Sequence, residues 1–427
     1  MINLILLGRT NYGKSTICGR LASEYGIIEK DEIDRAKKHS EVLEKKGMEY
    51  AFLMDKSLEE RQRGITIQLG FIGIELGNKR LNIMDPPGHI EFINNLISGV
   101  AGADAAVLMI DIKEFEKIGI DSQVEEHIRI SYVFGIEQMI ILMNKMDEVN
   151  YSEEKYEKIK KEMIQILEKA GYENAKEFNY IPVSAMEDEN ISRKSEKMQW
   201  YKGDNFVNIL KEFKEPIRYI KGPLRMPILR VFSLPKIGEV LTGRIESGQI
   251  KIGDQIMVSP SFSEIKMTAK ISSIEWQHRQ VDTAWHGMDV GIALKDKSPT
   301  FTKRQIKKGY IATDLKNELK PIKKFEAEVI ILNHPTEIKE GYKPVIFCHQ
   351  TRIPCIITKI KFTIDKDGKE LDKNVKNLKK DQRAIVEITP LKPFVTEEES
   401  QRPKLGRFIL RDANITVVAG KITKIIE

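Results

Sequence analysis

Cysteine is scarce in this sequence, which contains only Cys18, Cys348 and Cys355 among its 427 residues. Three cysteines so far apart cannot form a disulfide framework and lack the spacing of a metal site. The chain also has no low-complexity tract and no run of about eighteen apolar residues, the length that a membrane-spanning helix needs. These absences exclude a disulfide-stapled protein and a helical membrane protein. They favour a reducing cytoplasm, with no secretory leader and no membrane partner expected.

Charge of one sign does not dominate the chain, because 69 Lys and Arg face 63 Asp and Glu. The two signs are nevertheless unevenly distributed. Residues 1–222 contain 32 basic and 38 acidic side chains, residues 223–320 contain 16 and 10, and residues 321–427 contain 21 and 15. A basic C-terminal half suits a polyanionic partner, although a lysine-rich surface kept for solubility explains the charge equally well.

The most informative stretch is 8-GRTNYGKST-16, which lies between a short apolar strand and the start of a helix. Its spacing is that of a phosphate-binding P-loop. Backbone N–H groups at the helix start bind phosphate oxygens, Lys14 adds a positive charge, and the Ser15 hydroxyl can ligate Mg²⁺. The residues expected to cradle the phosphates are Asn11, Tyr12, Gly13, Lys14, Ser15 and Thr16.

Two later segments are placed to sense the γ-phosphate. Thr66 follows a long charged stretch predicted as two helices, and it can reach the metal. Asp85 ends an apolar strand and can hold the metal's hydration shell, while Gly88 offers a backbone N–H to the γ-phosphate. Losing that contact on hydrolysis would release the segment. His89 is the candidate catalytic residue, because it directly follows Gly88 and can orient an attacking water.

A guanine-reading pattern ends the strand predicted at residues 139–147. The Asp147 carboxylate can accept from guanine N1 and the exocyclic amine, whereas Asn144 braces the loop and Lys145 lies along the ring. Adenine lacks both donors, so the pattern predicts GTP rather than ATP as the bound nucleotide. The next strand ends in Ser184, Ala185 and Met186, which can present a backbone N–H to guanine O6.

Strands alternate with amphipathic helices over residues 1–222, which predicts a doubly wound α/β P-loop GTPase domain with a mostly parallel sheet. From residue 223 the pattern changes to short strands separated by Gly and Asp turns. This pattern predicts two all-β barrel domains, at residues 223–320 and 321–427.

The combined motifs resemble the translational GTPases of the elongation factor 1-alpha and Tu superfamily. The likeness rests on RGITI, D-x-PGH, NKMD and SAM in the first domain, GRIESG in the first barrel, and LNHP, GYKPV and LGRF in the second. It implies a cytoplasmic, monomeric GTPase that binds GTP or GDP with Mg²⁺ and has slow hydrolysis stimulated by the ribosome. It also implies Ser15, Thr66 and Asp85 around the metal, aminoacyl-tRNA as cargo, and a possible nucleotide-exchange factor.

Some positions depart from the family pattern. Thr10 replaces a valine of the apolar gate whose other half is Ile65, and Asn11 replaces an aspartate near the phosphates. In the first barrel, Glu275 matches a position that lines the aminoacyl pocket in the family. Trp276 and Trp285 are bulkier than the residues usual in the family. Only one histidine of a neighbouring pair is kept. The segment 112–121 is expected to be a short loop. These departures indicate a divergent paralogue.

The resemblance favours delivery of aminoacyl-tRNA to the ribosome, and two alternatives stay open. The cargo could instead be a release or ribosome-rescue protein. The chain could also be the regulatory GTPase subunit of ATP sulfurylase, which has the same three-domain plan and which residues 149–159 and 191–203 resemble. The last-domain motifs favour an elongation factor. A GTP-binding protein without turnover is disfavoured, because Thr66, Gly88 and His89 are all present.

Overall fold

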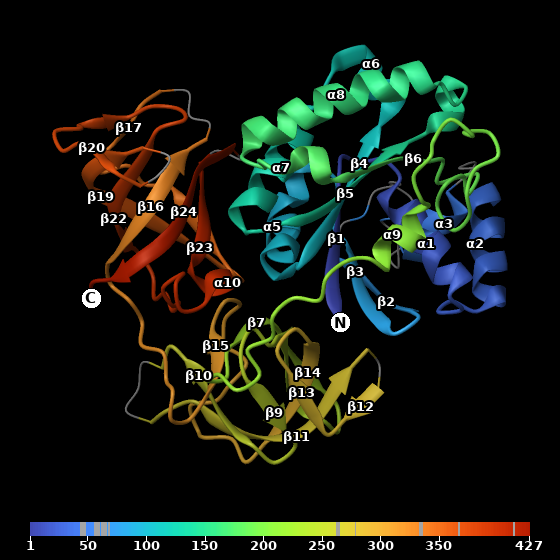
Figure 1. Ribbon diagram of the computed structural model, residues 1–427. Helices are drawn as coiled ribbons and strands as arrows, with labels where there is room; N and C mark the ends of the chain where they lie inside the picture. Colours follow the sequence, from blue (N-terminus) through green and yellow to red (C-terminus); the bar gives the residue numbers. More distant parts are fainter. Residues whose placement is uncertain are drawn as a thin grey trace. The chain divides into compact units, whose positions relative to one another are not determined.

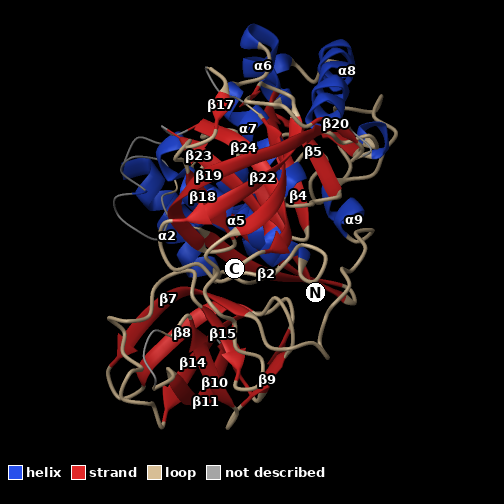
Figure 2. Cartoon of the chain, turned by 90° about the vertical axis from the view of Figure 1, so that its left-hand side faces the viewer, coloured by secondary structure: helices blue, strands red, loops and turns tan. Residues whose placement is uncertain are grey.

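The computed structural model describes residues 1–42, 48–54, 60, 66, 69–261, 265–277, 279–332, 336–365, 368–412 and 415–427. The chain divides into two units, Met1–Pro216 and Ile217–Glu427. Helices are concentrated in the first unit and strands make up most of the second (Figure 2). None of the helices in these ranges is long and apolar enough to cross a membrane.

The first unit is built on a six-stranded sheet with the order β2-β3-β1-β4-β5-β6. The central strands β1 and β4 are buried at every position, which is why they read as continuous apolar runs. All neighbours are parallel except β2, which pairs antiparallel with β3 at the edge. The strands are β1 (Ile2–Leu7), β2 (Gly70–Leu76), β3 (Lys79–Asp85), β4 (Ala105–Asp111), β5 (Gln138–Asn144) and β6 (Asn179–Pro182).

Helices cover both faces of this sheet (Figure 1). On one face lies α1 (Lys14–Glu24), with α3 (Glu49–Met54) packed on it and α2 (Lys30–Val42) packed on α3. The other face carries α5 (Ile93–Gly102), α7 (Ser122–Val133) and α8 (Glu153–Ala170). Shorter elements are η1 (Ile90–Phe92), α6 (Ile112–Ile118), η2 (Met146–Val149), η3 (Ala175–Glu177) and α9 (Phe206–Leu210).

The two helices predicted in the charged stretch are present as α2 and α3. Residues 43–47, 55–59, 61–65 and 67–68, which include Ile65 of the gate and the predicted strand start, lie outside the described residues.

The loop predicted at residues 112–121 is wrong, because α6 occupies most of it. Asp111, the last residue of β4, caps this helix by accepting hydrogen bonds from the backbone N–H groups of Lys113 at 3.1 Å and Glu114 at 3.0 Å. Ile112 and Phe115 bury its inner side. A strand that ends in a capping aspartate can thus pass directly into a helix, leaving no loop between them.

The first barrel of the second unit is closed. Its strands follow the order β10-β15-β7-β8-β14-β11, and β10 also pairs with β11. Trp285 is 45% exposed, so its bulk does not serve core packing, while Trp276 is partly buried. The strands are β7 (Met226–Leu234), β8 (Gly238–Arg244), β10 (Gln255–Ser259), β11 (Thr268–Trp276), β14 (Asp289–Lys295) and β15 (Ile311–Asp314), accompanied by β9 (Gln249–Lys251), β12 (Arg279–Val281) and β13 (Thr283–Trp285).

The second barrel closes in the same way, with the order β18-β23-β24-β16-β22-β19 and an added β18–β19 pairing. Its core includes Phe325, whose ring contacts those of Phe394 and Phe408. The strands are β16 (Phe325–Ile331), β18 (Val345–Cys348), β19 (Thr351–Ile364), β22 (Arg383–Pro390), β23 (Arg407–Asp412) and β24 (Ile415–Ile425), accompanied by β17 (Ile338–Lys339), β20 (Glu370–Asp372), β21 (Asn377–Leu378) and α10 (Pro403–Gly406). The predicted fold class, an α/β P-loop domain followed by two barrels, is confirmed.

Candidate nucleotide site

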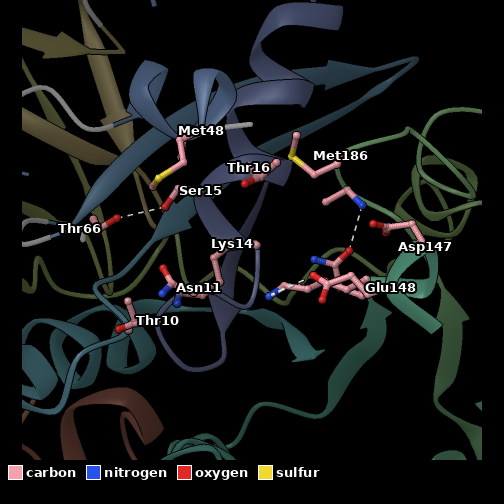
Figure 3. A pocket seen from close by; sticks show the side chains of 16 residues that line it. Thr10, Asn11, Lys14, Ser15, Thr16, Met48, Thr66, Asp147, Glu148 and Met186 are labelled. Carbon is pink, nitrogen blue, oxygen red and sulfur yellow. Dashed lines mark hydrogen bonds and ion pairs between the residues drawn. The ribbon is translucent and has the colours of Figure 1, made fainter. Parts of the chain in front are cut away.

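A cavity of about 420 Å³ lies in the first unit where β1, β3, β5 and β6 end (Figure 3). This is the position expected for a ligand in an open α/β sheet, because strand carboxyl ends and helix starts converge there. The start of α3 adds one wall, through Met48 and Ala51. The described lining residues are Thr10, Asn11, Gly13, Lys14, Ser15, Thr16, Met48, Ala51, Thr66, Gly88, Asn144, Lys145, Asp147, Glu148, Ala185 and Met186.

The P-loop wraps around the Lys14 ammonium group. Lys14 is buried, and its Nζ donates to the carbonyl oxygens of Gly8 at 2.9 Å and Arg9 at 3.0 Å. Gly13 has a φ of 98° and comes directly before α1. A Cβ at Gly13 would overlap the side-chain amide of Asn144, so both the backbone conformation and the space require glycine. The loop therefore presents backbone N–H groups and one cation to the cavity.

Asn144 ties the P-loop to the loop after β6. Its Nδ2 donates to the Tyr12 carbonyl at 2.8 Å, and its Oδ1 accepts from the Ala185 backbone N–H at 2.9 Å. The side chain is buried, which strengthens both bonds. Asn144 therefore forms hydrogen bonds with two different loops.

The other two residues of the guanine-reading pattern, Lys145 and Asp147, both line the cavity. Lys145 has a φ of 66°, and its Nζ forms an ion pair with Asp111 at 2.6 Å. Its ammonium group is therefore anchored, and the aliphatic part of the side chain remains at the cavity wall.

Asp85 is fully buried beneath the P-loop, and neither carboxylate oxygen has a hydrogen-bond partner in the described part of the chain. Burial raises the pKa of this carboxyl to about 6, although the charge of Lys14 and the proximity of the Ser15 hydroxyl lower it. Nearby, the hydroxyls of Ser15 and Thr66 are 3.0 Å apart and hydrogen-bonded (Figure 3). A buried carboxylate without a partner marks a position where another group can bind.

Four of the predicted site residues are not among the described lining residues. Tyr12 and Ser184 are buried behind the wall, and Asp85 lies beneath it. The His89 side chain is 43% exposed, and its Nδ1 accepts from the Glu91 backbone N–H at 3.3 Å. Gly88, in contrast, approaches the P-loop so closely that a Cβ would overlap Lys14 Nζ.

Arg20 was not predicted from the sequence, yet it contacts the loop after β6. Its Nε donates to the Ala185 carbonyl at 2.9 Å and its Nη2 to the Met186 carbonyl at 2.6 Å. Arg20 is 9% exposed on α1. The only sequence signal was an arginine within the otherwise apolar and small stretch 17-ICGRLA-22.

Comparison with known proteins assigns all three parts of the chain. The Elongation factor Tu GTP binding domain family matches residues 1–242, Elongation factor Tu domain 2 matches residues 238–311, and the GTP-eEF1A C-terminal domain-like family matches residues 324–423. Together with the P-loop fold, these matches define a translational GTPase, an enzyme that binds GTP or GDP and hydrolyses GTP.

Whole-chain relatives narrow the assignment. Elongation factor 1-alpha of Plasmodium falciparum is 37% identical over 99% of this chain and 95% of its own length. Elongation factor 1-alpha of Methanocaldococcus jannaschii is 36% identical over 98% of this chain and 96% of its own length. Elongation factor 1-alpha 1 of Euplotes crassus is 39% identical over 99% of this chain and 96% of its own length. The chain therefore belongs to the elongation factor 1-alpha family.

Solved structures share the fold at lower identity. The GTP-bound Ski7 GTPase-like domain of S. cerevisiae has a TM-score of 0.82 at 20% identity, covering 99% of this chain and 97% of that one. Elongation factor SelB of Methanococcus maripaludis, in complex with a GTP analogue, has a TM-score of 0.70 at 21% identity. The match covers 100% of this chain and 79% of that one.

Proposed function

We propose that this protein binds aminoacyl-tRNA in its GTP form, delivers it to the ribosome and releases it after hydrolysis. One observation supports the tRNA part of this proposal. A second cavity, of about 590 Å³, lies within the Ile217–Glu427 unit and is lined by segments of both barrels. Of its described lining residues five are cations and none is a carboxylate, the cations being Arg304, Lys307, Lys308, Arg352 and Lys392.

The electrostatics of this second cavity suit a phosphate backbone. Burial and the nearby charge of Arg230 lower the pKa of Lys308 from its usual value. A bound phosphate would reverse this effect and would release counterions from the cations around it. The +6 charge of each barrel adds long-range attraction. A nucleic acid backbone therefore fits this cavity better than a neutral or cationic partner.

The nucleotide would occupy the first cavity with its phosphates in the P-loop and its base between Asn144, Lys145, Asp147 and the loop after β6. Because Asn144 already engages the Ala185 N–H, the Met186 N–H is the donor left for guanine O6. Asp147 lines the cavity and would accept from the two guanine N–H donors.

The residues around Asp85 fit Mg²⁺, since they supply a carboxylate without a partner and two hydroxyls, the hard oxygen ligands that this ion prefers. Ser15 and Thr66 would hold the ion directly, and Asp85 would hold it through water. When bound, the ion would neutralise charge on the β- and γ-phosphates.

His89 would orient the attacking water only after moving toward the cavity, because its side chain lies outside it. Gly88 would donate its backbone N–H to the γ-phosphate, and loss of that phosphate would release the segment that carries His89. We propose the ribosome as the partner that brings His89 into place. A nucleotide-exchange factor, a monomeric state and a cytoplasmic location complete this proposal.

Protection of the aminoacyl ester tests the function. The protein is mixed with aminoacyl-tRNA in the presence of GTP or GDP, and spontaneous deacylation is timed. Slower deacylation with GTP alone is expected. No protection with either nucleotide would refute tRNA delivery and would move weight to a protein cargo.

Variants of the basic cavity test the observation that supports the proposal. In R352Q and K392Q, each lost phosphate contact should weaken tRNA binding and reduce the slope of log affinity against log salt by about one. K359Q is the matched control, an exposed lysine on β19 that does not line the cavity. An equal loss of tRNA affinity in all three variants would show that the overall positive charge of the barrels, and not this cavity, is responsible for tRNA binding.

A further inference from the structure

Arg20 holds the loop that follows β6 from behind. Its two donors reach the consecutive carbonyls of Ala185 and Met186, at 2.9 and 2.6 Å. Both residues line the nucleotide cavity. A planar guanidinium that donates to two successive carbonyls fixes the orientation of the intervening peptide, and with it the direction of the Met186 N–H.

The same guanidinium contacts α3 on its other side. Its Cζ lies 4.5 Å from the centre of the Tyr50 ring, a cation–π distance. The neighbouring residue Gly19 brings the two helices together, because a Cβ there would overlap the Tyr50 carbonyl oxygen. Gly19 and Arg20 thus form a docking point for α3 on α1.

Helix α3 also borders the nucleotide. Ala51 and the preceding Met48 line the cavity, while Phe52 and Leu53 belong to a small buried cluster with Ala36 of α2. One element therefore contacts the cavity and packs against the residue that fixes the base loop. A direct path of two contacts therefore runs from Tyr50 of α3 to Arg20, and from Arg20 to the loop after β6.

We infer that Arg20 is a positioning residue through which the docking of α3 on α1 sets the lifetime of bound guanine nucleotide. When α3 is docked, the Tyr50 ring shields the guanidinium from water, which strengthens its bonds to the two carbonyls. When α3 undocks, water competes for the guanidinium and the loop loosens. The inference rests on the proposed placement of guanine against Met186.

The rate of GDP dissociation measures this directly, with a fluorescent GDP analogue displaced by excess GDP. R20M removes both donors and should raise the dissociation rate about tenfold, equivalent to about 1.4 kcal/mol. R20K keeps the charge and one possible hydrogen bond. Its GDP dissociation rate should therefore lie between those of the parent protein and R20M. R35M, an exposed arginine on α2, is the matched control and should leave the rate unchanged. Melting temperatures with GDP absent verify that each variant is folded.

A nucleotide without O6 separates positioning from general damage. The diphosphate of 2-aminopurine riboside lacks the oxygen that the Met186 N–H would contact. Its dissociation rate should be nearly the same in R20M and the parent protein, whereas that of GDP rises. Equal acceleration of both nucleotides would mean that R20M merely loosens the fold, and would overturn the positioning role.

Substitutions of Tyr50 test the path from α3. Y50L removes the ring and should accelerate GDP release, whereas Y50F keeps the ring and should not. The double variant R20M/Y50L should be no faster than R20M, since Tyr50 acts through Arg20. Additive effects would refute the path, and an unchanged rate in R20M would refute the inference entirely. The failure of D147N to alter base preference would instead refute the proposed base placement.

Discussion

Arg225 and Glu397 form a buried ion pair that joins the two barrels, with Nη2 and Oε1 2.8 Å apart. Their side chains are only 5% and 11% exposed. Arg225 Nη1 also donates to the carbonyls of Leu224 and Asn317, both at 2.9 Å. Since Arg225 precedes β7 and Glu397 follows β22, the pair connects residues 172 positions apart in the chain.

Breaking this pair should strongly destabilise the second unit. E397Q or R225M leaves one buried group unpaired, and we expect a loss of about 3–5 kcal/mol in the free energy of unfolding. Urea unfolding followed by circular dichroism measures it. K323M, which removes one partner of the exposed Lys323–Glu427 pair, should leave the midpoint nearly unchanged. Similar midpoints for E397Q and K323M would contradict the importance of the buried pair.

His349 should make the second unit sensitive to acid. Its Nε2 lies 3.0 Å from the Val395 carbonyl, and burial lowers its pKa to about 4 from the usual 6.5. The unfolded chain therefore binds a proton between pH 6.5 and 4 that the folded chain excludes, and stability falls as the pH drops through this window. The full effect is about 3 kcal/mol.

The variant H349Q isolates this effect, because its amide can still donate to Val395 but cannot titrate. Its free energy of unfolding, measured from pH 7 to pH 4, should fall less steeply than that of the parent protein. Parallel curves for the two proteins would show that other groups dominate the acid sensitivity.

D147N should exchange the base preference. An amide can donate to the second carbonyl of xanthine but cannot accept from both guanine donors. We expect GDP affinity to fall about 100-fold, as the loss of about 3 kcal/mol from a charged hydrogen-bonding group predicts, and xanthosine diphosphate to bind better. Titration calorimetry measures the dissociation constants of both GDP and xanthosine diphosphate. E148Q, altered at the next carboxylate of the cavity wall, is the control and should retain GDP binding.

H89A should separate binding from turnover. Because His89 is not among the described lining residues of the cavity, GTP affinity should stay unchanged. Ribosome-stimulated hydrolysis should fall about 10²- to 10⁴-fold, the usual contribution of a positioned general base or water-orienting group. Single-turnover phosphate release with ribosomes measures it, and E91Q serves as a neighbouring control. Undiminished stimulated turnover in H89A would remove His89 from the mechanism.

Local rules were enough to predict that most of the candidate site residues line one cavity. The P-loop and the NKMD stretch have fixed spacings and follow apolar strands, so strand ends alone bring Lys14, Asn144 and Asp147 to one edge of the sheet. The parallel order of the sheet follows from alternating strands and helices. These features depend on residues close in sequence or on a single repeated unit.

Other features depend on contacts that no local pattern reveals. Arg20 reaches a loop 165 positions away, and its role depends on where α3 docks. The 112–121 segment was predicted as a loop because the capping ability of Asp111 is invisible when that residue is taken only as a strand end. The sequence shows Trp285 only as bulkier than the family norm, and its exposure becomes apparent only in the β9–β13 pair.

Closure of the two barrels has a consequence for self-association. Free strand edges are templates on which other chains add strands, the first step of many aggregates. In the described barrels the short pairings at Gln255–Met257 and Val345–Cys348 join what would otherwise be two long edges. Another copy of the chain could add a strand only after one of these pairings had opened. The few hydrogen bonds of the two pairings therefore protect the β-rich half of the chain against aggregation.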